Sequence, residues 1–475
     1  MTSETAARFD VIVIGAGPAG EVVAGRLATA GLATAIVERE LVGGECSYFA
    51  CMPSKALLRP RQVLAEAERV PGAAGAATGD LDVSAVFAWR DEIVRGLDDA
   101  SQVPWLESRG VVLLRGHGRL AGERRVMVDE VLYEAERAVV LAVGSTAARP
   151  PIPGLREAQP WTNREITTSS RVPGRLVVLG GGVVGVEMAD AYRSFGAEVI
   201  VLERGDRLVP RVEPFASGEL LGAFRERRIE VHLGVRAERV ERIDGTVRVE
   251  LGDGRRVAGD EVLVALGRSP LTDDLGLDTV GLKPGAFIGV DDHLRVPGRP
   301  WLYAIGDVNG RSLLTHVGKH QAHDVSEIIL GRRSRRVAPP AGSPQVIFTE
   351  PQIAGVGLTL AEALAAGIRA KAYDVPTAAS AGAAFTGRRT KGTSRIVVDE
   401  RRGRIVGATF VGPEVGEWLH AATIAIVGEV PIERLWDAVA VFPTRSEVWL
   451  SLLETREAAL ATRPSRIHDD DSDRV

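Results

Sequence analysis

The chain contains one structural pattern twice: an apolar strand, a glycine turn, a helix and a second apolar strand that ends in glutamate. The first copy occupies residues 9–38 and the second occupies residues 175–203. The strands are short runs rich in Val and Ile, which is typical of strands buried on both faces of a parallel sheet. Two such units predict an α/β chain with two doubly wound nucleotide-binding domains.

The glycine turn of the first copy reads GAGPAG and stands between a strand and a helix. Gly15 allows the tight turn, Gly17 lets the backbone approach a pyrophosphate, and Gly20 permits close packing of the helix on the strand. Around Pro18, the N–H groups and the dipole at the start of the helix favour negative charge. Glu38 ends the second strand and can accept hydrogen bonds from a ribose. A plain glycine turn is the alternative, but the flanking strand, the helix and Glu38 favour dinucleotide binding.

The second glycine turn, GGGVVG, repeats this logic, and its cofactor-binding residues are Gly180, Gly182 and Gly185. The acidic residue of this copy is Glu203. A carboxylate there bonds the 2′-hydroxyl of NADH and repels the 2′-phosphate of NADPH. Arg204 and Arg207 would partly offset that repulsion. We expect NADH rather than NADPH.

The chain has only two cysteines, Cys46 and Cys51, with four residues between them. Residues 1–10 lack the basic start and apolar core of a signal peptide, so the structural disulfide of a secreted domain is a poor explanation. No histidine lies close enough in sequence to complete a zinc site, and we expect no metal. In a chain that binds dinucleotides, the pair indicates redox chemistry.

Composition excludes other classes of partner. No run of about 18 apolar residues is present, so no helix is expected to span a membrane. The formal net charge of −5 gives no electrostatic reason to expect nucleic acid or an anionic membrane. We therefore expect a cytoplasmic enzyme with a small-molecule substrate.

The segment GGECSYFACMPSK, residues 43–55, resembles the redox centre of the class I pyridine nucleotide–disulfide oxidoreductases. This is the family of dihydrolipoamide dehydrogenase, glutathione reductase and mercuric reductase. Further along, AVGS at 142–145 and ALGR at 265–268 match the family's two domain-closing turns, and YAIGD at 303–307 matches its second flavin motif. The resemblance extends over residues 9–455 and implies FAD and NADH as cofactors. The cofactor-binding residues that it adds are Gly44, Gly144, Gly267 and Asp307, the last of which would hold the ribityl chain.

The resemblance also implies roles for the residues around the cysteines. Cys51 is then the thiol that contacts the flavin as a charge-transfer pair, and Cys46 is the interchange thiol that attacks substrate. Cys51 also stands where a helix is expected to begin, and a helix N-terminus lowers the pKa of a thiol. Lys55 is expected to approach the flavin ring and to pair with Glu187, because a cation there stabilises negative charge on the reduced flavin. A solvated surface lysine is the alternative.

The sequence departs from the family at its C-terminal acid–base pair. In relatives, the C-terminal domain of the partner subunit supplies a histidine that moves the proton of the interchange thiol, and a glutamate five residues later orients it. In VAVFPTRSE, residues 439–447, Glu447 is present but Phe442 stands where the histidine belongs. Phenylalanine carries no proton, and losing a general acid–base typically costs about 10²–10⁴ in rate.

Two explanations of Phe442 stay open. The first is a reductase whose substrate has a low-pKa leaving thiol and needs no acid. The second is a likeness to 2-ketopropyl coenzyme M oxidoreductase/carboxylase, a relative that has phenylalanine here and cleaves a thioether. That relative also replaces the glutamate, whereas this chain keeps Glu447, so we do not transfer the carboxylation. Mercuric reductase is excluded because it needs an additional cysteine pair and the chain has no third cysteine.

Tyr48 and Phe49 replace the smaller or polar residues that are common between the family's cysteines. They either reshape the pocket beside the disulfide or pack against the core.

We therefore predict an α/β protein with two doubly wound Rossmann-type nucleotide-binding domains and a C-terminal α+β dimerisation domain. The family implies a homodimer. The predicted parts are an FAD-binding domain at 1–150, an NAD(P)-binding domain at 151–270, a central segment completing the FAD domain at 271–340, a dimerisation domain at 341–462 and a disordered tail at 463–475.

The predicted reaction passes electrons from NADH through FAD to the Cys46–Cys51 disulfide and on to a disulfide or other thiol-cleaved substrate. One rival is a diaphorase whose flavin reduces a quinone directly, and Phe442 favours it because direct transfer needs no thiol base. Another is a flavin-bearing subunit without turnover. The intact Cys46, Cys51, Lys55 and Glu187 argue against that last interpretation.

Overall fold

The computed structural model describes residues 5–77, 79–332 and 343–461. The predicted tail at 463–475 lies outside these residues. The chain forms two compact units, of which the first comprises Met1–Val63, Gly79–Pro210 and Leu220–Ser343. The second unit comprises Leu64–Thr78, Arg211–Glu219 and Pro344–Val475. The domain boundaries expected from the sequence stay predictions.

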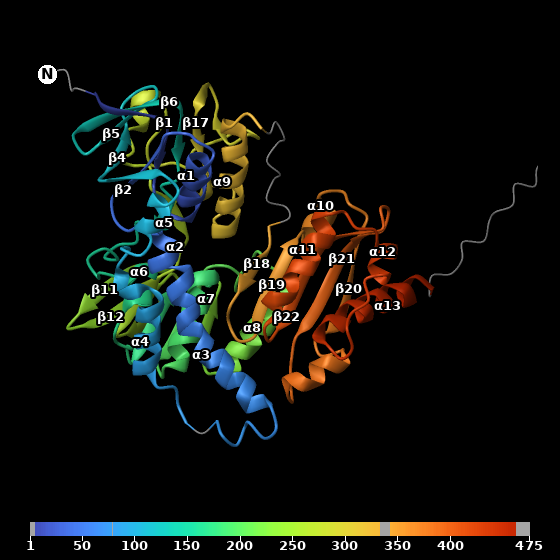
Figure 1. Ribbon diagram of the computed structural model, residues 1–475. Helices are drawn as coiled ribbons and strands as arrows, with labels where there is room; N and C mark the ends of the chain where they lie inside the picture. Colours follow the sequence, from blue (N-terminus) through green and yellow to red (C-terminus); the bar gives the residue numbers. More distant parts are fainter. Residues whose placement is uncertain (1–4, 78, 333–342, 462–475) are drawn as a thin grey trace, which may run out of the picture. The chain divides into compact units, whose positions relative to one another are not determined.

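The first glycine turn follows β1, an inner strand of an eight-stranded sheet in the first unit (Figure 1). β1 (Thr5–Ile14) pairs in parallel with β2 (Thr34–Glu38) on one side and with β6 (Val131–Leu141) on the other. The sheet order is β16-β17-β6-β1-β2-β3, with β5 attached to β6 and β4 to β5. The remaining strands of this sheet are β3 (Val111–Arg115), β4 (Gly118–Leu120), β5 (Arg125–Val128), β16 (Arg295–Val296) and β17 (Arg299–Ala304).

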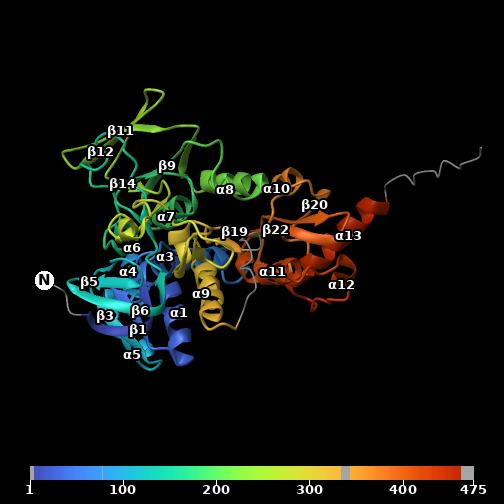
Figure 2. The ribbon, with the colours of Figure 1, turned by 90° about the horizontal axis from the view of Figure 1, so that it is seen from above.

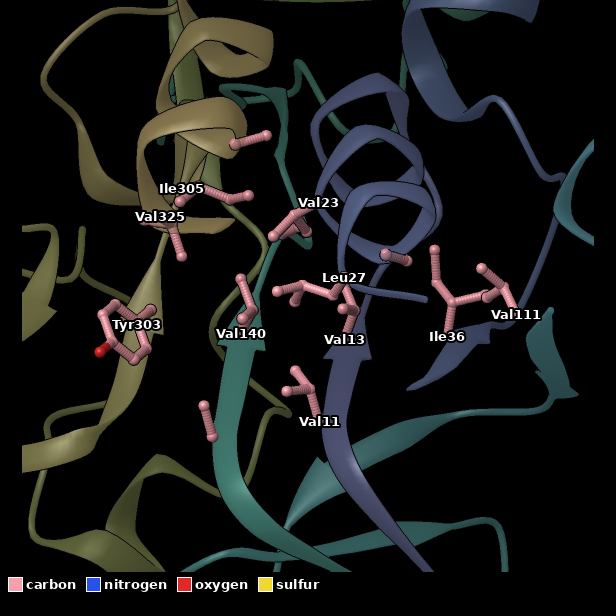
Figure 3. Close-up of a cluster of buried hydrophobic side chains, with 14 of the residues drawn as sticks. Val11, Val13, Val23, Leu27, Ile36, Val111, Val140, Tyr303, Ile305 and Val325 are labelled. Atoms are coloured by element: carbon pink, nitrogen blue, oxygen red, sulfur yellow. The ribbon is translucent and has the colours of Figure 1, made fainter. Parts of the chain in front are cut away.

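This sheet is buried on both faces, as the Val- and Ile-rich strand predicted. Val11 and Val13 point toward the helices α1 (Pro18–Thr29) and α9 (Thr315–Ile329), where they meet Leu27 and Val325 (Figure 3). The alternate residues, such as Ile12, belong to a separate core cluster. The two clusters follow from the period of two along a strand. This doubly covered sheet fixes the position of the glycine turn that follows β1.

The second β-α-β unit forms its own parallel sheet in the order β10-β9-β8-β14. Its helix α7 (Val183–Ser194) follows the second glycine turn, as predicted. The strands are β8 (Arg175–Leu179), β9 (Glu198–Glu203), β10 (Glu230–Leu233) and β14 (Glu261–Val264). Smaller sheets beside it contain β11 (Ala237–Ile243), β12 (Thr246–Leu251), β13 (Arg256–Gly259), β7 (Ser145–Ala147) and β15 (Arg268–Pro270).

Further helices lie between these strands along the chain, and two of them carry the cysteines. The helices are α2 (Gly44–Tyr48), α3 (Cys51–Arg69), α4 (Val83–Ile93), α5 (Val103–Glu107), α6 (Asn163–Thr168) and α8 (Pro214–Glu226). α3 begins at Cys51, as the sequence predicted.

The second unit is built on a five-stranded antiparallel sheet in the order β18-β19-β22-β21-β20 (Figure 1), whose strands are coloured orange in Figure 2. Helix α11 lies against β19 and β22, and α13 lies against β20 and β21. Phe410 is fully buried in the core between sheet and helices. The elements are β18 (Gln345–Ile347), β19 (Gln352–Gly357), α10 (Leu360–Ala365), β20 (Ala370–Pro376), β21 (Thr393–Asp399), β22 (Arg404–Gly412), α11 (Leu419–Val427), α12 (Ile432–Trp436) and α13 (Val448–Ala461).

Candidate active site

The first glycine turn forms a cradle between β1 and α1. Gly15 has a φ of +101°, and a Cβ atom there would lie 2.5 Å from the carbonyl oxygen of Ala142. A Cβ atom at Gly20 would lie 1.9 Å from the carbonyl oxygen of Gly15, so both positions require glycine. The helix starts at Pro18, and within the described chain no side chain caps it at Gly17. The N–H groups of its first turn can therefore bind an anion.

Glu38 and Gly44 stand beside this cradle. The Glu38 carboxylate accepts hydrogen bonds from the backbone N–H groups of Ala16 and Glu40, each at 2.8 Å. A Cβ atom at Gly44 would lie only 2.9 Å from the Cα atom of Gly17. The segment that carries the cysteines therefore begins directly against the cradle.

The second glycine turn has the same construction. Gly180 has a φ of +107°, and a Cβ atom there would lie 2.4 Å from the carbonyl oxygen of Ala265. A Cβ atom at Gly185 would lie 1.9 Å from the carbonyl oxygen of Gly180. No side chain in the described ranges caps α7 at Gly182. This is a second place where phosphates fit a helix N-terminus.

Glu203 holds its carboxylate at the second cradle. It accepts hydrogen bonds from the N–H groups of Gly181 and Gly205, each at 2.6 Å. The Arg207 guanidinium donates to the Pro210 carbonyl at 2.7 Å, within its own loop. The carboxylate thus stands where it would meet the 2′-hydroxyl of NADH, and its charge opposes a 2′-phosphate.

Asp307 belongs to a partly buried polar cluster with the two closing turns. Its carboxylate accepts a hydrogen bond from the Ser145 hydroxyl at 2.5 Å, and the Arg268 guanidinium donates to the same hydroxyl at 2.6 Å. Burial raises the pKa of Asp307. Gly144 and Gly267, which precede Ser145 and Arg268, adopt φ angles of +74° and +115°.

Both cysteines are free thiols, and each shifts the pKa of the other. Cys46 lies in α2, and Cys51 is the first residue of α3, with its Sγ atom 3.4 Å from the Thr315 hydroxyl. The hydrogen bond from Cys46 lowers the pKa of Cys51 to about 6, with help from Thr315 and the charge of Lys55 and against burial. The same hydrogen bond, together with burial, raises the pKa of Cys46. The pair therefore holds its negative charge on Cys51 and its proton on Cys46.

Lys55 joins α3, the helix that begins at Cys51, to α7 of the second β-α-β unit. Its Nζ atom lies 2.9 Å from the Oε2 atom of Glu187, which is only 3% exposed on α7. This is the ion pair that the sequence predicted. Two dinucleotide cradles, a coupled pair of thiols and a lysine beside them define a class of protein, a dinucleotide-dependent oxidoreductase with redox-active thiols.

Tyr48 and Phe49 pack into the core rather than line a pocket. They are 2% and 9% exposed and form a small cluster with Val94. The Arg164 guanidinium covers the Phe49 ring at 4.2 Å from its centroid. Of the two explanations open at the level of sequence, the structure supports core packing.

Phe442 and Glu447 both belong to the second unit. Phe442 is 73% exposed, and Val439 and Val441 beside it are 87% and 72% exposed. Glu447 accepts a weak hydrogen bond from the Gly382 N–H at 3.4 Å. This strip therefore presents an apolar surface, and Phe442 supplies no group that could exchange a proton.

The comparisons with known proteins agree with this class. The family model for pyridine nucleotide-disulphide oxidoreductases matches residues 9–322. The family model for the dimerisation domain of these enzymes matches residues 343–452. The chain belongs to the pyridine nucleotide-disulphide oxidoreductase family.

Similar proteins cover nearly the whole chain. The dihydrolipoyl dehydrogenase of Haloferax volcanii is 31% identical over 97% of this chain and 98% of its own length. That of Thermus scotoductus is 32% identical over 95% and 97%. Among solved structures, LpdA from Mycobacterium tuberculosis has a TM-score of 0.83 at 26% identity, over 94% of this chain and 99% of that chain. The HOCl-induced flavoprotein disulfide reductase RclA from Escherichia coli has the same fold, with a TM-score of 0.84 at 24% identity over 94% and 99%.

Family membership confirms the predicted fold class, the enzyme class and the cofactors FAD and NADH. The chain is an FAD-dependent disulfide oxidoreductase. Its own residues fit these groups, because the first and last glycines of each cradle leave no space for a Cβ atom and the middle glycine faces open space. In the described part of the chain, each cradle leads into a helix that no side chain caps, with a carboxylate beside it. The dimerisation domain supports the predicted homodimer. Among the residues that the structure describes, no helix is both long and apolar enough to cross a membrane.

Several residues of the site were not predicted from the sequence. Thr315, which contacts Cys51, follows the second flavin motif, and no sequence spacing predicts this contact. Glu45 and its partners Asn163 and Arg164 were also missed. The only sequence signal was a charged residue directly before Cys46, inside a motif that otherwise matched the family.

Proposed function

We propose that this enzyme passes two electrons from NADH through FAD to the Cys46–Cys51 disulfide, and that the resulting dithiol reduces a disulfide substrate with a low-pKa leaving thiol. The observation that carries the proposal is the placement of the two thiols, with Cys46 in α2 and Cys51 as the first residue of α3, its Sγ atom 3.4 Å from the Thr315 hydroxyl. The hydrogen bond from Cys46 lowers the pKa of Cys51 to about 6, so Cys51 is largely thiolate near neutral pH and can accept the proton of Cys46.

When bound, FAD accepts a hydride from NADH and delivers two electrons to the disulfide. Reduction leaves the negative charge on Cys51, where the Thr315 hydroxyl and the charge of Lys55 favour it. The proton stays on Cys46, and the Cys51 thiolate is the base within hydrogen-bonding distance of it.

Thiol exchange then proceeds in two displacements. Cys46 gives its proton to Cys51 and attacks one substrate sulfur, the substrate S–S bond breaks, and the first thiolate leaves. Cys51 next loses its proton to water or to the departed thiolate. It attacks the sulfur of Cys46, which releases the second thiolate and restores the Cys46–Cys51 disulfide.

The first departing thiolate leaves without a proton if Phe442 occupies the position of the family's histidine in the dimer. A leaving thiol with a low pKa departs faster and needs no acid. Aromatic disulfides have such leaving groups, whereas simple aliphatic disulfides do not. Phe442 therefore supports a substrate of the first kind.

A second candidate is a diaphorase that reduces a quinone from the flavin. The exposed apolar strip of Phe442, Val439 and Val441 favours it, because an aromatic acceptor fits an apolar surface and needs no thiol base. Thioether cleavage of the 2-ketopropyl coenzyme M kind has less support, because Glu447 is retained.

An anaerobic titration tests the proposal. NADH is added stepwise, then NADPH in a separate sample, while the flavin absorption spectrum is followed. We expect a long-wavelength charge-transfer band after two electrons, because the Cys51 thiolate would contact oxidised flavin. Bleaching of the flavin without that band would place the cysteines outside the electron path.

Cys46→Ser separates the two candidates. For a thiol mechanism, reduction of an aromatic disulfide vanishes in this variant while reduction of a quinone survives. If the variant reduces the disulfide as fast as the natural enzyme, the thiol mechanism is wrong.

A further inference from the structure

Glu45 lies directly before Cys46 in α2, and polar side chains from two other segments contact its carboxylate. Its carboxylate accepts hydrogen bonds from the Asn163 side-chain amide at 2.7 Å and from the Arg164 Nε atom at 3.0 Å. The Arg268 guanidinium lies 3.7 Å away. Asn163 and Arg164 are the first two residues of α6, so this carboxylate ties the cysteine segment to that helix.

The same helix also holds the segment at a second point, directly before Cys51. The carbonyl oxygen of Phe49 accepts hydrogen bonds from the Asn163 side chain at 2.9 Å and from the Thr167 hydroxyl at 3.2 Å. Arg164 also covers the Phe49 ring. Each thiol therefore stands within two residues of an anchor on α6.

Helix α6 is itself held firmly. A capping box between Thr162 and Glu165 closes its N-terminus. Trp161, which precedes the N-cap residue Thr162, donates its N–H to the Val262 carbonyl at 2.8 Å and so joins the sheet of the second β-α-β unit. The Tyr192 hydroxyl on α7 donates to the Ile166 carbonyl at 2.7 Å. A helix fixed at several points can position what it binds.

We propose that Glu45 is a positioning residue that acts through Asn163 and Arg164 to hold the thiol of Cys46 against that of Cys51. The proposal rests on the proposed function, in which these thiols are redox-active. A hydrogen bond between two thiols requires both backbones to stay in place. Without the Glu45 carboxylate, α6 still holds the segment through the carbonyl of Phe49, and we expect Cys46, at the other end of the segment, to become more mobile.

Two properties of the thiols then change. Cys51 loses part of the hydrogen bond that stabilises its thiolate, so its pKa rises toward its ordinary value. The thiols also meet less often, which makes their disulfide less stable relative to the dithiol. A tenfold fall in the effective concentration of one thiol at the other raises the midpoint potential by about 30 mV.

If the ion pair between Glu45 and Arg164 had only a structural role, its loss would change the stability of the fold and leave the thiols unchanged. Arg164 and Glu45 side chains are 37% and 21% exposed, and partly exposed pairs of this kind contribute little to the stability of a fold. Loss of the pair should therefore leave the melting temperature nearly unchanged, while the thiols respond.

The test compares Glu45→Gln with the natural enzyme and with Glu198→Gln, both as flavin-loaded dimers. Glu198 is a matched control because it also binds an arginine, Arg175 at 2.7 Å, on the surface of the second dinucleotide unit. Three properties are measured: hydrogen exchange of the amides of residues 43–51, the pH midpoint of the charge-transfer band in the two-electron-reduced enzyme, and the dithiol midpoint potential. For Glu45→Gln we expect exchange faster by about tenfold or more, a higher pH midpoint and a less negative potential. Glu198→Gln should match the natural enzyme.

Arg164→Gln provides a second variant, because it removes the charged partner that Glu45 shares with Glu40 and leaves Glu45 in place. We expect it to change the same three properties in the same direction. If both variants leave exchange and pH midpoint unchanged, the positioning role is refuted. If the natural enzyme shows no charge-transfer band, the proposed function fails, and hydrogen exchange of residues 43–51 alone then decides whether Glu45 holds the segment.

Discussion

The low pKa of Cys51 can be tested by removing its main hydrogen-bond donor. Its pKa is about 6 against an ordinary value of 9.0, chiefly because of the hydrogen bond from Cys46. Cys46→Ala removes that donor. A hydrogen bond to a charged group contributes about 1.5–3 kcal/mol, and one pKa unit corresponds to about 1.4 kcal/mol. We therefore expect the pKa of Cys51 to rise by about one to two units in this variant.

The assay is a pH titration of the charge-transfer absorbance of the oxidised enzyme. In Cys46→Ala the remaining thiol cannot form the disulfide, so the Cys51 thiolate can contact oxidised flavin without any reductant. Deprotonation creates the thiolate, so the band appears as pH rises through the pKa and is lost below it. Cys46→Ser is the matched control, because its hydroxyl can still donate to the Cys51 thiolate. We expect midpoints near pH 6 for Cys46→Ser and about 7–8 for Cys46→Ala.

Two further substitutions in the Cys46→Ser background test the order of causes. The Thr315 hydroxyl lowers the pKa of Cys51 less than the hydrogen bond from Cys46 does. The charge of Lys55 lowers it less than Thr315 does. Thr315→Val should therefore raise the midpoint more than Lys55→Met does. Equal midpoints in Cys46→Ala and Cys46→Ser, in variants that retain full flavin, would refute this account of the thiolate.

Four other substitutions have outcomes that can be checked directly. Glu203→Gln keeps an acceptor for the Gly181 N–H but removes the charge, so we expect kcat/KM for NADPH relative to NADH to rise by about tenfold or more. An unchanged ratio would mean that Glu203 does not select the nucleotide. The hydroxyl of Tyr48 is buried without a hydrogen-bond partner in the part of the chain that the structure describes, so Tyr48→Phe should leave the free energy of unfolding unchanged or higher. Tyr192→Phe loses the hydrogen bond to Ile166 and should lower the free energy of unfolding by about 1 kcal/mol in denaturant titrations. Equal effects of Tyr48→Phe and Tyr192→Phe would contradict the roles given to these two hydroxyls. Phe442→His should raise turnover of an aliphatic disulfide by about 10²-fold or more, and unchanged turnover would show that the missing acid–base is not what limits the reaction.

The local parts of the site were predictable from the sequence. The alternation of strand residues, the two glycine turns and the glutamates that end the strands depend on neighbours within about 30 residues, the size of one β-α-β unit. The helix start at Cys51 belongs to the same group. The pair between Lys55 and Glu187 joins distant residues, but its prediction needed only the family resemblance, because both lie in matched motifs.

The contacts that tune the thiols were decided by the tertiary structure alone. Thr315 and Cys51 are 264 residues apart, and Glu45 and Asn163 are 118 apart. Tyr48 could have lined a pocket or joined the core, and only the packing around it chose the core. The physical reason is that a local pattern specifies which face of an element is apolar, whereas a single polar contact depends on how whole elements are stacked. A shift of about 1 Å in that stacking makes or breaks such a contact, and no periodicity in the chain records it.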